Sequence, residues 1–330
     1  MQKRVKWIEV LKGLAVVAMY IGCFGSGGTV YELVSTHHAA LFFCVFGLVE
    51  TFENEERILK YISKKIRTVL IPCFVLAFLV VIMITIQYDC GLDTVKGMTD
   101  GIVNGIIRNT FVADSLWYLT CLFSIQLLFF MVNKIKWKWL VFCVCLGLHI
   151  GNVLWINTMQ NPSWPFNVDS AFYYLVFYAI GYFMFPYVDQ LFKIDTRKKK
   201  VVIIVTGIIS LLCAMEVFFW RDILTYPNTL TTVGFIPSVR AAVIIWLYFI
   251  AARWLQNVKL LADIGDNLLY LCGSLYMFII LTNTAVSIIG LSFGLNSSIQ
   301  IFAYLGILIV VGNKYLVPIE RYLVEKIVKE

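Results

Sequence analysis

Lys12 and Cys23 are the first two side chains of this 330-residue chain whose types and spacing suit chemistry. They are eleven positions apart, about three turns of an α-helix, so both point to one face roughly 16 Å from each other. The spacing predicts a cation near one end of a helix and a thiol deeper within it. A lysine whose ammonium group reaches back to water from an apolar helix explains Lys12 equally well.

A histidine and an arginine follow. His38 heads the run HAALFFCVFG, and an imidazole with a pKa of about 6.5 suits a general base, although a lone histidine at a helix end is more often structural. Arg67, in KKIRTVLIP, is placed where a cation would meet a phosphate-rich ligand. The nine cysteines include no CxxC pair, so we expect no metal site.

Ionisable residues also lie at the starts of later apolar segments. Asp114 precedes SLWYL, the run that contains Trp117; Asp169 lies in WPFNVDSAF, and Arg240 opens another segment. Ionisable side chains within membrane segments are costly, so each is a hypothetical site residue. An aspartate at a helix start is also an ordinary N-cap, and both interpretations stay open.

Ten apolar segments must position these side chains. The chain is 60% hydrophobic and 14% charged, with a mean hydropathy of +0.83, far from the averages of soluble proteins. We predict an all-α integral membrane bundle, with residues 1–330 forming a single polytopic domain. Because about 20 apolar residues cross the hydrocarbon, the segments are placed at about 7–26, 30–49, 67–88, 115–133, 138–157, 169–188, 201–220, 238–255, 266–290 and 297–317.

Basic residues concentrate in every second gap between these segments. All but four of the 27 Lys and Arg residues follow this pattern, and the exceptions are Lys96, Arg108, Arg221 and Arg240. Because basic residues are retained on the cytoplasmic side, the N- and C-termini are both predicted to be cytoplasmic. This bias and anionic lipid headgroups account for the net charge of +7. We therefore expect membrane lipid, and no nucleic acid, among the partners.

The longest gap, residues 89–114, falls on the predicted external side. Its apolar residues recur at helical spacing, among them Val95, Met98 and Ile102. Such spacing predicts an amphipathic helix that lies on the membrane surface.

Six blocks of the sequence, taken in order, resemble the membrane-bound acyltransferase 3 family. Their order, their spacing and the ten-segment topology carry the resemblance, since no single block is specific. The blocks are WIEVLKGLAVVAMYIGCF, HAALFFCVFG, KKIRTVLIPCF, SLWYLTCLF, WPFNVDSAFYYLVFYAIGY and IGDNLLYLCGSLYMF.

This resemblance implies an O-acyltransferase that moves an acyl group, usually acetyl from acetyl-CoA, to a hydroxyl of a cell-envelope or exopolysaccharide glycan, free or lipid-linked. Lys12 and Arg67 would bind the phosphates of acyl-CoA, and His38 would act as a base or position the acceptor. A bacterial source, a multi-pass location in the plasma membrane and a homo-oligomer are further expectations. The residues expected to contact the acceptor are Trp117, Asp169, Asp114 and Arg240.

The chain departs from the family pattern at its most reactive positions. The family's Arg-x10-His pair reads Lys12-x10-Cys23 here, and Ala39-Ala40 replaces the Met-Pro of the second block. Lysine keeps the charge but lacks the planar guanidinium group of arginine, which can donate two hydrogen bonds to one phosphate. Cysteine is no base at neutral pH unless its pKa of about 8.5 is lowered.

Two interpretations of these departures stay open. In the first, Cys23 takes the acyl group as a thioester and His38 then activates the acceptor. In the second, Cys23 is an inert thiol in a catalytically degenerate member that acts as a membrane carrier or flippase-like transport module. A plain secondary transporter is disfavoured, because the segments lack paired Gly/Pro breaks and acidic relay residues.

Overall fold

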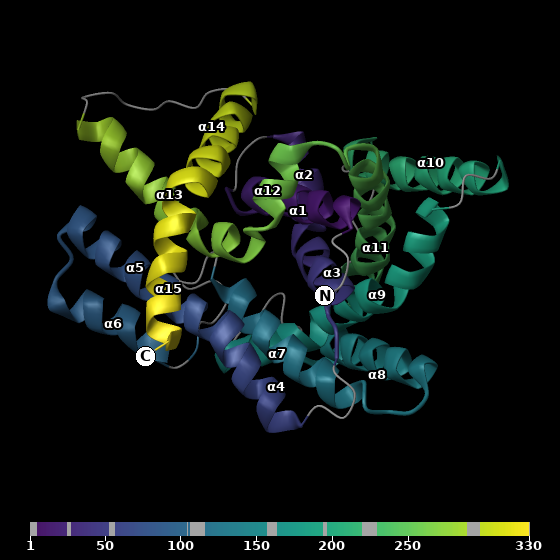
Figure 1. The fold of residues 1–330 in the computed structure, drawn as a ribbon, viewed down its shortest axis with the longest axis horizontal. Coiled ribbons are helices and arrows are strands. Elements are labelled where there is room, and N and C mark those ends of the chain that lie inside the picture. Colours follow the sequence, from purple (N-terminus) through teal and green to yellow (C-terminus); the bar gives the residue numbers. More distant parts are fainter. Residues whose placement is uncertain are drawn as a thin grey trace. The chain divides into compact units, whose positions relative to one another are not determined.

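The computed structural model describes residues 5–24, 28–52, 57–103, 105, 116–156, 164–193, 197–219, 230–288 and 298–329. Within these ranges the chain is built of helices joined by short turns, and they contain no β-strand (Figure 1). The predicted all-α class is therefore confirmed.

The helices are labelled in chain order in Figure 1. They are α1 (Lys6–Phe24), α2 (Thr29–Ser35), α3 (His38–Val49), α4 (Ile58–Lys65), α5 (Ile71–Tyr88), α6 (Leu92–Val103), α7 (Trp117–Val132), α8 (Lys138–Gly151), α9 (Val168–Lys193), α10 (Arg197–Phe219), α11 (Leu230–Trp254), α12 (Lys259–Gly265), α13 (Leu268–Ile288), α14 (Ser298–Val311) and α15 (Val317–Lys329). The short helical turns η1 (Ile66–Leu70), η3 (Asn152–Ile156), η4 (Pro165–Asn167) and η5 (Gly312–Leu316) continue or precede these helices.

Seven helical stretches among the described residues are long and apolar enough to cross a membrane. The shorter apolar helices His38–Val49, Trp117–Val132 and Lys200–Met215 lie at the other three predicted segments. A helical architecture with several candidate membrane spans is thus confirmed, whereas the count of ten spans and the cytoplasmic position of both ends stay predictions. The seven stretches are Lys6–Phe24, Ile58–Tyr88, Lys138–Ile156, Pro165–Phe192, Ile236–Trp254, Leu268–Ala285 and Ile299–Val328.

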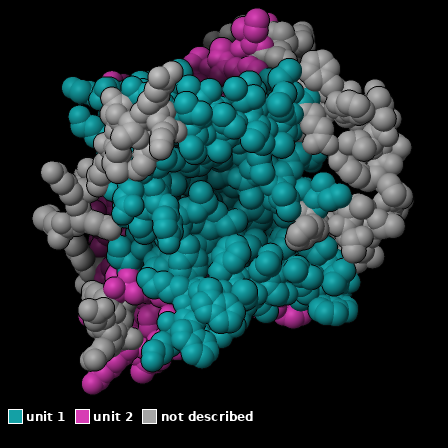
Figure 2. All heavy atoms as spheres, turned by 90° about the vertical axis from the view of Figure 1, so that its right-hand side faces the viewer, with its two compact units in different colours: residues 1–51, 135–156, 173–268 teal, residues 52–134, 157–172, 269–330 magenta. Residues whose placement is uncertain are grey.

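The chain divides into two compact units, coloured separately in Figure 2. Each unit combines three stretches that are separated in the sequence, so neither is a continuous piece of chain. The single domain predicted for residues 1–330 stays a prediction. Unit 1 comprises Met1–Thr51, Ile135–Ile156 and Tyr173–Leu268, and unit 2 comprises Phe52–Lys134, Asn157–Phe172 and Leu269–Glu330.

Helices α1 and α12 of unit 1 touch backbone to backbone. A Cβ added to Gly13 would collide with the carbonyl oxygen of Leu261, and one added to Gly265 would collide with that of Glu9. Small residues allow such close approach between helices in membranes. The sequence blocks WIEVLKGLA and IGDNLL therefore supply the two sides of one crossing.

A second close crossing joins α3 and α9. A Cβ on Gly47 would collide with the carbonyl oxygen of Tyr178, and one on Gly181 with that of Cys44. The Tyr178 hydroxyl also donates a 2.6 Å hydrogen bond to Oε2 of Glu50, just after α3. These contacts fix α3, the helix that begins with His38.

Aromatic side chains complete the core around α1. The ring of Trp7 packs edge-on against that of Phe192, with the ring centroids 5.4 Å apart, and its centroid is 5.9 Å from that of Phe249. Trp246 stacks near both Phe192 and Phe249. Such rings bury large apolar areas, so they hold α1 against α9 and α11.

Helix α6 lies within the gap where an amphipathic helix is predicted. It spans Leu92–Val103, and its Met98 and Ile102 side chains are buried. The helix is thus confirmed within the described residues, while its position on a membrane surface stays a prediction.

Candidate functional site

Lys12 and Cys23 belong to one uninterrupted helix, α1, as their spacing predicts. The Lys12 ammonium group is paired with the carboxylate of Glu9 and lies 3.9 Å from Oδ1 of Asp266. The crossing of α1 with α12 brings Asp266 to this position. An incoming phosphate would have to compete with two carboxylates for Lys12.

His38 lies against α1 at Gly22, the residue before Cys23. A Cβ on Gly22 would come within 2.5 Å of Cγ of the His38 ring, so the ring occupies the space that only a glycine leaves. Its Nδ1 is 3.2 Å from the carbonyl oxygen of Val34. A carbonyl only accepts, so Nδ1 carries the proton and Nε2 is the basic nitrogen of the neutral ring. The structure therefore brings His38 next to the residue that precedes Cys23.

His37 takes part in a polar contact that the sequence did not single out. Its side chain is 2% exposed, and its Nε2 lies 2.9 Å from the hydroxyl of Tyr248 on α11. Its Nδ1 is 3.3 Å from Oγ1 of Thr36. The sequence signal was the His37-His38 pair itself, but only His38 heads the block that resembles the family.

Arg240 lies on α11 in the same unit, and its charge interacts electrostatically with His37. Its Nε atom is buried and has no hydrogen-bond partner among the described residues. Near it on α11, the buried hydroxyl of Ser238 is 2.8 Å from the hydroxyl of Tyr173. The predicted site residues Lys12, Cys23, His38 and Arg240 thus all belong to unit 1.

Trp117 and Asp169 belong to unit 2 and are linked through the turn η4. Nδ2 of Asn167 donates to Oγ1 of Thr120 at 2.7 Å and to the carbonyl oxygen of Trp117 at 3.4 Å. Phe166 and Asn167 both have positive φ, a rare conformation for residues other than glycine. The bonds to α7 hold this turn, and Asp169 follows it, fully buried in the first turn of α9.

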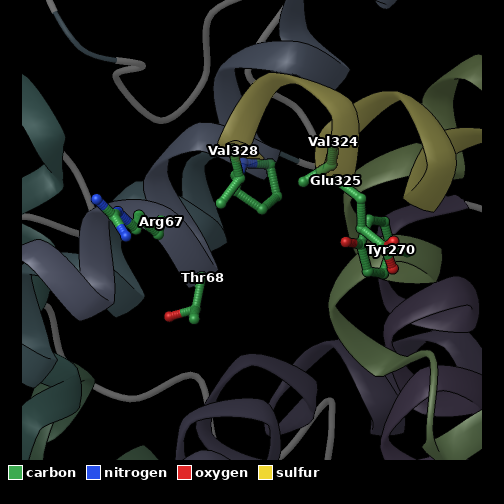
Figure 3. A pocket seen from close by; sticks show the side chains of 7 residues that line it. Arg67, Thr68, Tyr270, Val324, Glu325 and Val328 are labelled. Atoms are coloured by element: carbon green, nitrogen blue, oxygen red, sulfur yellow. The ribbon is translucent and has the colours of Figure 1, made fainter. Parts of the chain in front are cut away.

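Arg67 lines a cavity of about 270 Å³ in unit 2. The arginine comes from η1, while Tyr270 of α13 and Val324 and Glu325 of α15 form other parts of the wall. Figure 3 shows Arg67 on one side of the cavity, with Tyr270 and Glu325 on another. The cavity therefore presents a cation and a carboxylate over a partly apolar wall.

Two further expectations concern Asp114 and metals. Asp114 lies outside the described residues. In the part of the chain that the structure describes, no group of three or more His, Cys, Asp or Glu side chains is placed to hold a metal ion.

A comparison with protein-family models matches residues 5–313 to the acyltransferase 3 model, described as an acyltransferase domain. No curated protein and no solved structure matches the chain. The match spans most of the sequence and confirms the resemblance that the six blocks indicate. It ends before α15, which contributes Glu325 to the cavity of unit 2.

Proposed function

The chain belongs to the acyltransferase 3 family, and on that premise we propose that it is an integral-membrane O-acyltransferase of a bacterial plasma membrane. It would move an acyl group, expected to be acetyl, from acyl-CoA to a hydroxyl of a cell-envelope or exopolysaccharide glycan. The observation that best supports this function is the packing of His38 against Gly22, next to Cys23. This packing puts a candidate base one position along α1 from a candidate nucleophile, and acyl transfer through a covalent intermediate needs both groups.

Acyl-CoA is the proposed donor because its phosphates require cations. Arg67 is exposed at the cavity of unit 2, and its guanidinium fork suits bidentate contacts with phosphate. Lys12 of unit 1 is a separate candidate for binding phosphate, which would have to displace Glu9 and Asp266 from its ammonium group. Membrane lipid surrounds the helices in this proposal.

The chemistry would proceed in two balanced steps. The Cys23 sulfur attacks the acyl carbonyl carbon, the bond from that carbon to the CoA sulfur breaks, and CoA leaves with the proton of the thiol. The acceptor hydroxyl then attacks the Cys23 thioester while its proton passes to Nε2 of His38. The bond to the Cys23 sulfur breaks, and the thiolate regains a proton from His38.

The test is transfer of radiolabelled acetyl from acetyl-CoA by the purified protein in lipid, with envelope glycan as the acceptor. We expect label on the wild-type protein that hydroxylamine removes, no such label on Cys23→Ala, and acylated protein without label on glycan for His38→Ala. Cys143→Ala is the matched control, because Cys143 is an exposed thiol of the same unit. Unchanged turnover in Cys23→Ala would rule out the thioester, and absence of acetyl-CoA binding would contradict the enzyme.

A catalytically degenerate carrier is the alternative. It is favoured by two observations: Lys12 is already engaged by carboxylates, and Cys23 stands at the family's histidine position. A carrier of the flippase type would move a lipid-linked glycan between the leaflets of a proteoliposome without acetyl-CoA. Such movement by wild type and Cys23→Ala alike, with no acetyl transfer, would establish the alternative.

A further inference from the structure

Arg240 is a cation in an apolar helix, and the part of the chain that the structure describes gives it no counter-charge. It lies in the stretch Ile236–Trp254, which is long and apolar enough to cross a membrane. Among the described residues, no Asp or Glu forms an ion pair with it, and its buried Nε lacks a hydrogen-bond partner. Ionisable groups at membrane depth are normally paired, and an unsatisfied buried donor is costly. An anion that is not part of the described residues would supply both a counter-charge for Arg240 and an acceptor for its Nε–H group.

His37, which lies within electrostatic range of Arg240, is polar and supplies no negative charge. The hydroxyl of Thr36 donates to the carbonyl oxygen of Leu33 at 2.7 Å, so its oxygen is left to accept from Nδ1 of His37. Nε2 of the neutral ring then accepts from the hydroxyl of Tyr248 at 2.9 Å. His37 and Tyr248 therefore hold each other in place as an uncharged pair, and the positive charge of Arg240 is not offset by them.

The His37–Tyr248 contact joins α11 to the junction of α2 and α3. Arg240 and Tyr248 are both on α11, and His37 lies at the junction of α2 and α3. The rings of His37 and Tyr248 pack at 5.3 Å in addition to their hydrogen bond. The His37–Tyr248 pair is therefore fixed before a ligand arrives, which lowers the entropic cost of binding.

We propose that Arg240, with His37 near it and Tyr248 holding the His37 ring, forms an oxyanion-binding site of unit 1. The ligand is a carboxylate or phosphate group, because these are the oxyanions that match the planar fork of arginine. Arg240 opens its segment at the end predicted to be external, so the oxyanion is assigned to the glycan acceptor, which makes that acceptor an acidic one. This last assignment rests on the proposed function, whereas the binding site itself does not.

The site is tested by the binding of oxyanions in the absence of any acyl donor. The outcome of this binding test is therefore independent of the acetyl-transfer assay. The protein is reconstituted in phosphatidylcholine nanodiscs, and its unfolding midpoint is followed by intrinsic fluorescence. Sodium glucuronate, inorganic phosphate and neutral glucose are titrated in turn. A parallel preparation in nanodiscs containing phosphatidylglycerol tests whether a lipid headgroup supplies the anion.

We expect glucuronate to raise the midpoint saturably in the wild type and not in Arg240→Gln, with no shift from glucose. The affinity should fall at least about tenfold, as expected for loss of a charge-assisted hydrogen bond. Lys259→Gln, which removes an exposed cation of the same unit, should respond as the wild type does. An Arg240-dependent shift with phosphate or only with phosphatidylglycerol would support the site and name phosphate or lipid as the source.

Tyr248→Phe keeps every charge and removes one hydroxyl, so it gives a second test if Arg240→Gln fails to fold. We expect it to weaken glucuronate binding severalfold, because His37 loses the partner that fixes its ring. Equal responses of wild type and Arg240→Gln to every probe, or no response of the wild type to any of them, would overturn the proposal.

Discussion

Gly265 lies so close to Gly13 that a Cβ on Gly265 would be 2.8 Å from the backbone nitrogen of Gly13. The two residues are far apart in the sequence, yet their contact sets the separation of α1 and α12. The same contact brings Asp266 within 3.9 Å of the Lys12 ammonium group. The packing of two glycines thus decides the electrostatic surroundings of a predicted ligand-binding lysine.

Replacing Gly265 by alanine should destabilise unit 1. The added methyl group would meet backbone atoms, which cannot rotate away, and overpacking of this kind costs about 1–3 kcal/mol. We expect a clear fall in the unfolding midpoint of the purified protein. Gly147→Ala is the control, because a Cβ there meets nothing within 4 Å; an equal effect of both changes would contradict the tight crossing.

Gly22→Ala should impair catalysis more than stability. The new Cβ would displace the ring of His38, a side chain that can rotate, so the fold should persist. A misplacement of about 1 Å can cost roughly a hundredfold in rate, and acetyl transfer should fall by about that factor. Normal turnover in a folded Gly22→Ala variant would show that the placement of His38 against α1 does not matter for the reaction.

Tyr178→Phe should weaken the attachment of α3 to α9. It removes the hydroxyl that donates to Glu50 at 2.6 Å, and a hydrogen bond to a charged group contributes about 1.5–3 kcal/mol. The measurement is again the unfolding midpoint. Tyr187→Phe, at an exposed position of the same helix, should leave the midpoint unchanged. An unchanged midpoint in Tyr178→Phe as well would contradict a stabilising hydrogen bond between Tyr178 and Glu50.

Arg67→Gln should raise the acetyl-CoA concentration that gives half-maximal transfer by about tenfold or more, because a charge-assisted contact with phosphate is lost. Arg67→Lys should recover part of the loss, since lysine keeps the charge without the fork. Lys64→Gln, which removes an exposed cation on α4, should behave as the wild type. Equal effects of Arg67→Gln and Lys64→Gln would indicate general charge attraction in place of a specific site.

Glu325→Gln tests the opposite wall of the same cavity. A carboxylate there repels the phosphates of CoA, so its neutralisation should lower the acetyl-CoA concentration for half-maximal transfer. The acetyl-transfer assay measures this concentration. Glu325→Asp, which keeps the charge, is the control. A weaker apparent affinity in Glu325→Gln would mean that the carboxylate contacts the ligand favourably.

The sequence alone determined the helical class and the positions of the apolar segments. Long apolar runs must satisfy their backbone groups internally, and a helix does so within one segment. The six sequence blocks were sufficient to predict the family that the comparison confirms. Lys12 and Cys23 were correctly placed on one helix, because spacing within a helix is a local property.

Contacts between helices required the tertiary structure. No sequence pattern predicted that Lys12 meets Asp266, or that His37 pairs with Tyr248 while its neighbour His38 faces Gly22. These neighbours depend on which helices cross and how closely their backbones approach, and the glycines at the crossings decide both. Residue types and spacing therefore determined which side chains are available for chemistry, and the helix crossings decided which of them meet.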